Sequence, residues 1–305
     1  MKKRWGIILC VCLLVTCSAL SLADEYTVKV SSPSGAPGLA LATLAVEHPE
    51  DYTYVTAETI TAEFANQTAD FIIAPLNAGA KLYKAGKSTY KLAAVVCWGN
   101  LYFASQKADF ALMDMDGRTV TLFGENTINA SIALYVLQAN GITPATVEYL
   151  AGAANTQSLL LSDPDAIVLT AEPALTAASI KNEAVTGFAV NDLYKEATGY
   201  EGYTQAGLFV RQQTLEEHQD AVKAFLEKAE SACENCTSDV AAVAEAAVAL
   251  EILPNQKVAM SAIPNCAIRY LSASQAKEQV EITANIDLSQ FGGSVPADDF
   301  YYAAE

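Results

Sequence analysis

The side chains that most often carry catalysis are scarce in this chain of 305 residues. It contains two histidines, His48 in a His-Pro-Glu-Asp turn and His218 in the segment Glu-Glu-His-Gln-Asp. Neither lies in a recognisable catalytic pattern, and the sequence has no Gly-x-Ser-x-Gly elbow and no His-Glu-x-x-His motif. General acid–base catalysis needs positioned proton donors and acceptors. The residue types therefore favour a protein that holds a ligand over an enzyme, and we predict no catalytic residue.

The cysteines do not form a recognisable metal or cofactor site either. Three of the seven lie in the first 17 residues, and the others are Cys97, Cys233, Cys236 and Cys266. A zinc site at Cys233-Glu-Asn-Cys236 would need two further soft ligands, and the chain has only the two histidines named above. In an exported chain this pair either closes a small loop or remains as thiols. Cys97 and Cys266 fall in apolar segments and are expected to be small core residues.

The first residues have the composition of a signal peptide. Basic Lys2–Arg4 precede the apolar run Trp5–Leu22, and Ser21-Leu22-Ala23 offers small residues where a signal peptidase reads. We expect residues 1–23 to be removed; a membrane anchor is the alternative, and the run is near the lower limit for a span. Leu14-Val15-Thr16-Cys17 also resembles a lipoprotein box, which leaves lipidation at Cys17 open. In either case the mature chain is extracytoplasmic, at the cell surface or in the periplasm.

The mature chain is strongly acidic. Without the three basic residues of the leader, 15 Lys and Arg stand against 35 Asp and Glu, a net charge of −20. Such a surface repels nucleic acid, which needs a basic footprint. With 52% hydrophobic residues, the chain has enough apolar side chains for a sizeable core, and its length suits two domains.

The polar residues of interest follow predicted strands. In the stretch Asp70–Ser105, the strand Phe71–Ala74, the helix Asn77–Ala85 and the strand Leu92–Cys97 follow one another. This order is typical of a βαβ unit in a sheet that is covered on both faces. Ligands of such sheets bind at the carboxyl ends of the strands, which here are Pro75-Leu76-Asn77 and Trp98-Gly99.

The other parts of the chain repeat this layout. The predicted strand Tyr26–Val30 precedes the loop Ser31–Gly38, and the strand Thr119–Phe123 precedes a loop that begins at Gly124. A further strand, Asp165–Thr170, ends just before Glu172. Two such loops that face each other would form a cleft. Glu172-Pro173 also begins a predicted helix, so Glu172 is either a helix-capping carboxylate or a ligand acceptor.

This arrangement resembles the substrate-binding proteins of bacterial ABC importers, in the branch for aliphatic sulfonates, nitrate or taurine, and thiamine pyrimidines. The resemblance runs from about Tyr26 to Tyr302 and rests on Asp70–Ser105, Leu159–Ala174 and the ending Phe291–Tyr302. It implies an α/β chain with the two-lobe periplasmic-binding-protein type II fold: two mixed, mostly parallel sheets joined by a two-strand hinge.

The hinge strands define the expected domains. Leu101–Ser105 and Thr204–Arg211 are the predicted crossings between the lobes. Residues 24–104 and 205–305 then form one lobe, and residues 105–204 form the other. We expect the chain to be a monomer.

The resemblance also implies a function. It points to an extracytoplasmic solute-binding protein that delivers a small organic anion or a heteroaromatic compound from an interlobe cleft to the membrane permease of an ABC importer. Two alternatives remain: an enzyme on the same fold that acts on a small heterocyclic or carboxylated substrate, and a sensor that presents its lobes to a membrane receptor.

The predicted ligand-binding residues are hydroxyls, amides, one indole and one carboxylate at strand ends. Such groups orient a ligand without reacting with it. Trp98 suits a flat ring by stacking, and paired helix N-termini suit an anion. The predicted residues are Ser32, Ser34, Gly35, Thr56, Asn77 and Trp98 from one lobe and Asn126, Thr127 and Glu172 from the other.

Overall fold

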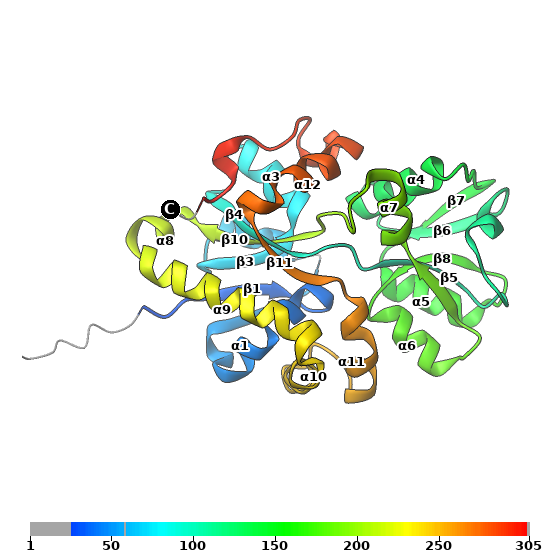
Figure 1. Ribbon diagram of the computed structural model, residues 1–305, viewed down its shortest axis with the longest axis horizontal. Coiled ribbons are helices and arrows are strands. Elements are labelled where there is room, and N and C mark those ends of the chain that lie inside the picture. Colours follow the sequence, from blue (N-terminus) through cyan, green and yellow to red (C-terminus); the bar gives the residue numbers. More distant parts are fainter. Residues whose placement is uncertain (1–25, 58, 304–305) are drawn as a thin grey trace, which may run out of the picture.

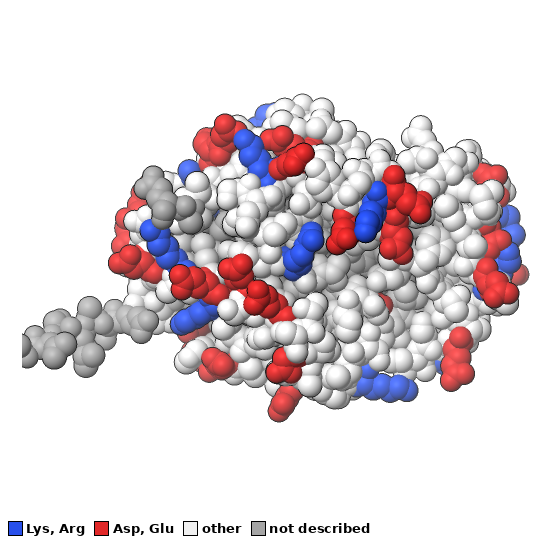
Figure 2. All heavy atoms as spheres, viewed as in Figure 1, with Lys and Arg blue, Asp and Glu red and all other residues white. Residues whose placement is uncertain are grey.

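The computed structural model describes residues 26–57 and 59–303, which form two α/β lobes side by side (Figure 1). The predicted leader with its three cysteines, and the predicted cleavage and lipidation sites, lie outside the described residues. Acidic and basic side chains are interspersed over the face shown in Figure 2. None of the helices in the described ranges is long and apolar enough to cross a membrane.

The first lobe is built on a six-stranded sheet with the order β11-β4-β10-β3-β1-β2. β1 pairs in parallel with β2 and β3, while β10 runs antiparallel to β3 and β4, and β11 antiparallel to β4. Four of its six strands therefore run in one direction. The strands are β1 (Val30–Pro33), β2 (Tyr52–Val55), β3 (Phe71–Pro75), β4 (Tyr90–Cys97), β10 (Ala206–Arg211) and β11 (Ile268–Ser272).

Helices cover both faces of this sheet (Figure 1). α3 and α12 lie on one face, and α1, α9 and α10 lie on the other. The helices are α1 (Ala42–Glu47), α2 (Glu63–Asn66), α3 (Leu76–Lys84), α8 (Gln212–Glu217), α9 (Gln219–Ser238), α10 (Val240–Ala249), α11 (Gln256–Ala262) and α12 (Ala273–Ile286). Short 3-10 helices span Ala36–Leu41, Pro49–Asp51, Ile60–Ala62, Ile263–Asn265, Leu288–Phe291 and Asp298–Phe300.

The second lobe is built on a five-stranded sheet with the order β7-β6-β8-β5-β9. β6 pairs in parallel with β7 and β8, and only β5 runs against its two neighbours. The strands are β5 (Leu101–Ser105), β6 (Thr119–Phe123), β7 (Thr146–Leu150), β8 (Ile167–Ala171) and β9 (Thr186–Ala189). The helices are α4 (Ile128–Ala139), α5 (Ala153–Ser162), α6 (Ala174–Lys181) and α7 (Val190–Thr198), with a 3-10 helix at Leu112–Met115. The two mixed, mostly parallel sheets predicted from the sequence are confirmed.

The core is continuous from one lobe to the other. One apolar cluster contains β3 and β4 side chains such as Ile72 and Val95 together with α4 and β6 side chains such as Ile132 and Leu122. Buried side chains on both faces explain why the strands appear as nearly unbroken apolar runs in the sequence. All four described cysteines are buried free thiols rather than disulfides.

Both crossings between the lobes are shorter than the predicted strands Leu101–Ser105 and Thr204–Arg211, and all six residues of β10 pair with β4 in the first sheet. All five residues of β5 pair with β8, so the strand belongs to the second sheet and does not span the lobes. The link from β4 is Trp98-Gly99-Asn100, held by Asn191 of α7, whose Nδ2 donates to the carbonyl oxygens of Trp98 (2.9 Å) and Gly99 (2.7 Å). Gly99 has φ +85°, a conformation that glycine adopts without strain.

Candidate functional site at the strand ends of the two sheets

Gln205, the residue just before β10, joins the ends of two strands of the first sheet. Its backbone N–H donates to the Cys97 carbonyl at the end of β4, and its carbonyl accepts from the Leu76 N–H after β3, each at 3.0 Å. Ala206 pairs with both Pro75 and Cys97. The carboxyl ends of β3 and β4 therefore lie on either side of the returning chain.

The second lobe reaches the same point through the start of α4. Asn129 lies in the first turn of this helix, and its Oδ1 accepts from Tyr203 Oη at 2.9 Å and from Gln205 Nε2 at 3.5 Å. Thr127 caps the helix, since its Oγ1 accepts from the Ala130 N–H. The N-terminus of α4, which follows β6, is thus adjacent to the ends of β3 and β4.

The end of β8 is tied to the first crossing. The Glu172 N–H donates to the Asn100 carbonyl at 2.9 Å, and Asn100 Nδ2 donates to the Glu172 carbonyl at 2.8 Å. The N-terminus of α4 and the carboxyl end of β8 each lie beside a crossing segment. Strand ends from both sheets therefore converge on the two connections between the lobes. Ligands of doubly wound sheets are bound at such edges.

Glu172 is a carboxylate with few partners. The residue is only 4% exposed, and its carboxylate accepts from the Thr176 N–H at 3.2 Å and the Thr176 hydroxyl at 2.8 Å. Burial raises the pKa of Glu172 above its ordinary value, although the two hydrogen bonds from Thr176 partly oppose this shift. The carboxyl group can accept hydrogen bonds when ionised and donate one when protonated.

Trp98 is packed into the protein in this conformation. The residue is 3% exposed, and its indole Nε1 donates to the Arg269 carbonyl at 2.8 Å. The Arg269 guanidinium carbon lies 4.4 Å from the ring centroid, so a cation already covers one face of the indole. Stacking of Trp98 on a ligand stays a prediction, and it requires exposure of the ring.

The other predicted residues of the first lobe lie at the same edge of its sheet. Ser32 is buried, Ser34 is exposed beyond β1, and Gly35 with φ +102° precedes the 3-10 helix Ala36–Leu41. Thr56 follows the edge strand β2, is exposed, and lies 3.2 Å from Thr59 through the two hydroxyl oxygens. Asn77 lies in the first turn of α3, with a buried Oδ1 that has no hydrogen-bond partner.

In the second lobe, the predicted residues are two turn residues and Glu172. Asn126 is exposed and has φ +59°, while Thr127 is half-buried at the α4 cap described above. Two further buried polar atoms near the crossings, Oδ1 of Asn100 and Oδ1 of Asn191, also have no hydrogen-bond partner. Buried polar atoms are normally satisfied by protein, water or ligand, so this region has unused hydrogen-bonding capacity.

Three residues of this region were not among those predicted from the sequence. Asn129, Tyr203 and Gln205 form the hydrogen-bonded contact between the lobes. A signal for Asn129 was present, because it lies in the polar loop between a predicted strand and a predicted helix. Tyr203 and Gln205 precede a strand rather than follow one, so the rule of carboxyl strand ends could not find them.

Comparisons with known proteins agree with this architecture. Residues 100–241 match the protein-family model described as NMT1/THI5 like. Among curated protein sequences, none matches significantly.

Three solved structures have the same fold over most of the chain. An ABC transporter protein from Parabacteroides distasonis has a TM-score of 0.78 at 21% identity, covering 92% of this chain and 99% of that one. The periplasmic aliphatic sulphonate binding protein SsuA from Escherichia coli has a TM-score of 0.70 at 14% identity, covering 91% and 92%. The alkanesulfonate-binding protein SsuA from Xanthomonas axonopodis pv. citri, bound to MOPS, has a TM-score of 0.66 at 15% identity, covering 91% and 99%. The chain therefore has the periplasmic-binding-protein type II fold, which consists of two α/β lobes.

Proposed function

We propose that this protein is an extracytoplasmic solute-binding protein of an ABC importer. It binds one small molecule between its lobes and delivers it to a membrane permease. The observation that carries the proposal is the convergence of strand ends from both sheets on the two crossing segments, where Asn77, Asn100 and Asn191 have buried polar atoms without partners. The shared fold with the sulfonate-binding proteins supports it.

The proposed ligand is a small organic anion or a heteroaromatic compound. The N-termini of α3 and α4 lie at this edge and offer backbone N–H groups to an anion. The side chains of Asn77 and Asn129 can each donate and accept, which suits the polar edge of a heterocycle. We expect Glu172 to accept from an amine or a ring N–H of the ligand, so Glu172→Gln should matter most for ligands that carry such a group.

A thermal-shift screen of sulfonates, pyrimidines and small dicarboxylates tests the proposal, with chemical analysis of each hit after incubation. A ligand at 100 times its Kd should stabilise the fold by ~2.7 kcal/mol. Asn129→Ala should weaken this shift, because it removes the acceptor shared by Tyr203 and Gln205. Asn140→Ala is the matched control, since Asn140 lies at the opposite end of the same helix. No stabilising compound in any of these classes would count against the proposal.

An enzyme on the same fold is the second candidate. The observation that favours it is Glu172, whose raised pKa is a property of many general acids and bases. Consumption of a hit during incubation with the parent, but not with Glu172→Gln, would establish this alternative.

The lobe boundaries and the processing of the chain belong to the same proposal. We propose that the mature, monomeric protein begins after Ala23, with the chain before the link Trp98-Gly99-Asn100 and residues 205–305 in one lobe, and the chain from β5 to residue 204 in the other; the pairing of β5 moves the boundary expected at residues 104 and 105 back to this link. The intact mass of the exported protein tests the processing: a chain that begins at Asp24 supports it, and a diacylated chain that begins at Cys17 contradicts it.

A further inference from the structure

A groove lies on the first lobe at the sheet edge opposite the candidate site. It has a volume of about 1310 Å³ and runs between the segment before β1, the turn after α1 and the start of α9. Lys29 precedes β1, and α8 follows the carboxyl end of antiparallel β10, so both lie away from the strand ends that meet the second lobe. Both histidines of the chain, His48 and His218, line this groove although they are 170 residues apart in the sequence.

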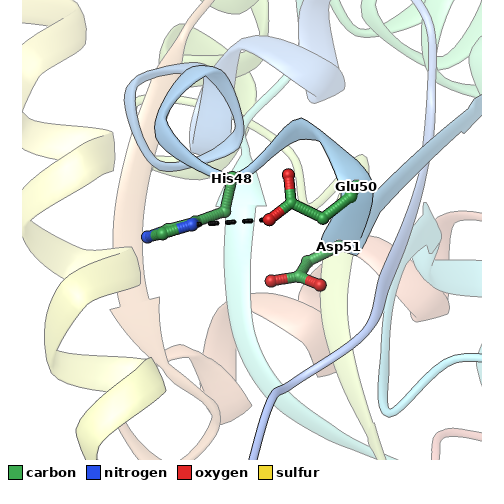
Figure 3. A group of neighbouring side chains, drawn as sticks. All are labelled: His48, Glu50 and Asp51. Atoms are coloured by element: carbon green, nitrogen blue, oxygen red, sulfur yellow. Dashed lines mark ion pairs between the residues drawn. The ribbon is translucent and has the colours of Figure 1, made fainter.

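Three side chains of the turn after α1 come together in this groove (Figure 3). His48, Glu50 and Asp51 each place one ligand atom so that all three atoms lie within 4.8 Å of one another. Nδ1 of His48 lies 3.7 Å from Oε1 of Glu50. The cluster is formed by the short 3-10 helix Pro49–Asp51, which carries Glu50 and Asp51, and by His48, the residue directly before it.

We propose that His48, Glu50 and Asp51 bind one divalent transition-metal ion of the zinc type. One imidazole and two carboxylates form a mixed nitrogen and oxygen ligand set, which suits Zn²⁺ and its neighbours better than Mg²⁺ or Ca²⁺. In a tetrahedral site with metal–ligand distances of about 2.1 Å, ligand atoms are about 3.4 Å apart. His48 Nδ1 and Glu50 Oε1 are 3.7 Å apart and all three ligand atoms lie within 4.8 Å of one another, so binding requires a movement of the exposed His48 and Glu50 side chains toward Asp51.

The electrostatic surroundings favour a cation. Glu216, Glu217 and Asp220 line the groove from α8 and α9 and add negative charge to that of the cluster. Lys29 and Lys228 are the basic residues of the lining, and Lys29 pairs with Asp51 Oδ1 at 2.5 Å. The ion must therefore share Asp51 with Lys29 or displace its ammonium group. This pair fixes Asp51, whose side chain is 13% exposed, whereas those of His48 and Glu50 are 67% and 68% exposed.

Calorimetric titration of the untagged mature protein with Zn²⁺ tests this site, after dialysis against a chelator and with excess Mg²⁺ present. We expect one saturable site per chain. His48→Ala and Glu50→Gln should each weaken it about tenfold or more, since even outer partners of metal ligands have effects of that size. Both residues are exposed, so neither change should alter the melting temperature of the metal-free protein.

His218→Ala is the matched control. It removes the only other histidine from the same groove, but His218 stacks on Tyr26 at a ring-centroid distance of 3.5 Å and lies outside the three-residue cluster. Binding should remain within about twofold of the parent, because no ligand is lost. The absence of saturable Zn²⁺ binding, full binding by His48→Ala, or an equal loss in His218→Ala would overturn the proposal.

Discussion

At the residue scale, Glu172 makes stability depend on pH. Its pKa is raised by burial, so the folded state binds the proton more tightly than the unfolded state, where the value is about 4.3. The stability that this group contributes is complete below the unfolded pKa and is lost as the pH rises through the folded pKa. Glu172→Gln should therefore flatten the fall in stability above about pH 4.3, as measured by urea unfolding across the pH range. An unchanged pH profile would show that Glu172 is not the group that titrates.

Trp98 should contribute strongly to stability as well as to the site. Its ring is buried beneath Arg269, and Trp98→Ala should lower the free energy of unfolding by about 3–5 kcal/mol. Urea unfolding measures this loss. If the ring also stacks on the ligand, binding of a planar compound should weaken by a further 1–3 kcal/mol, roughly the range for a desolvated aromatic contact. A folded variant with unchanged affinity for the true ligand would assign Trp98 to the core alone.

The sequence identified Trp98 and Glu172 as candidate site residues but did not predict what they contact. The type and position of Trp98 and Glu172 made them visible as candidates, because each follows a buried strand. The Arg269 carbonyl that accepts from the indole is 171 residues away in the sequence, and no local sequence pattern predicts that contact. The burial that raises the pKa of Glu172 likewise depends on packing between distant segments.

At the element scale, the link Trp98-Gly99-Asn100 has little room for change. A Cβ at Gly99 would lie 2.4 Å from Cε1 of Tyr203 and 2.6 Å from Oδ1 of Asn191. Gly99→Ala should therefore destabilise the fold through both positive φ and steric overlap.

Gly86→Ala separates these two causes. Gly86 has φ +65° but open space around its Cβ position, so it should show only the conformational cost of about 1 kcal/mol. Gly99→Ala should lower the midpoint of urea unfolding further than Gly86→Ala does. Equal shifts of the two midpoints would mean that Tyr203 moves aside for the added methyl group without a measurable loss of stability.

The elements that the sequence predicted best are those with buried strands and clear breaks. β3, β4, β6 and β8 appear as apolar runs because helices cover both faces of their sheets. β9 (Thr186–Ala189) and α7 escaped prediction. β9 is a short edge strand with two exposed residues, Thr186 and Gly187, and so lacks both an apolar run and a regular alternation.

At the scale of the whole molecule, the two lobes touch outside the crossing segments. Ser131 Oγ of α4 donates to Asp287 Oδ2 after α12 at 2.7 Å, and Tyr102 Oη of β5 donates to the Asn265 carbonyl at 3.1 Å. These contacts connect the lobes on different elements. They would favour a closed arrangement if the lobes move about the crossings.

Ser131→Ala should therefore weaken ligand binding without contacting the ligand. Loss of one hydrogen bond to a carboxylate at a partly exposed site is worth about 1 kcal/mol, or roughly fivefold in affinity. Calorimetry with any compound from the screen measures the change. Ser158→Ala is the control, since its hydroxyl bonds only within α5 to the Ala154 carbonyl. Equal affinities of the two variants would exclude Ser131–Asp287 as a contact that favours binding.

The organisation into two lobes could be anticipated because the strand–loop–helix layout occurs twice and resembles a known family. The way the lobes meet could not. It depends on Asn129, Tyr203 and Gln205, whose hydrogen bonds join residues 74 and 76 positions apart. Hydrogen bonds between such distant residues produce no periodic pattern in the sequence.

Native mass spectrometry of the exported protein, purified without denaturation, tests whether the protein binds one small molecule between its lobes. Binding between the lobes without chemistry predicts a one-to-one adduct with a single small molecule that is released unchanged on unfolding and binds again to refolded protein. The adduct should be weaker in Asn129→Ala than in Asn140→Ala. A bound compound that is converted to another mass on incubation would contradict binding without chemistry, and an adduct that Asn129→Ala retains as fully as the parent would contradict a site between the lobes.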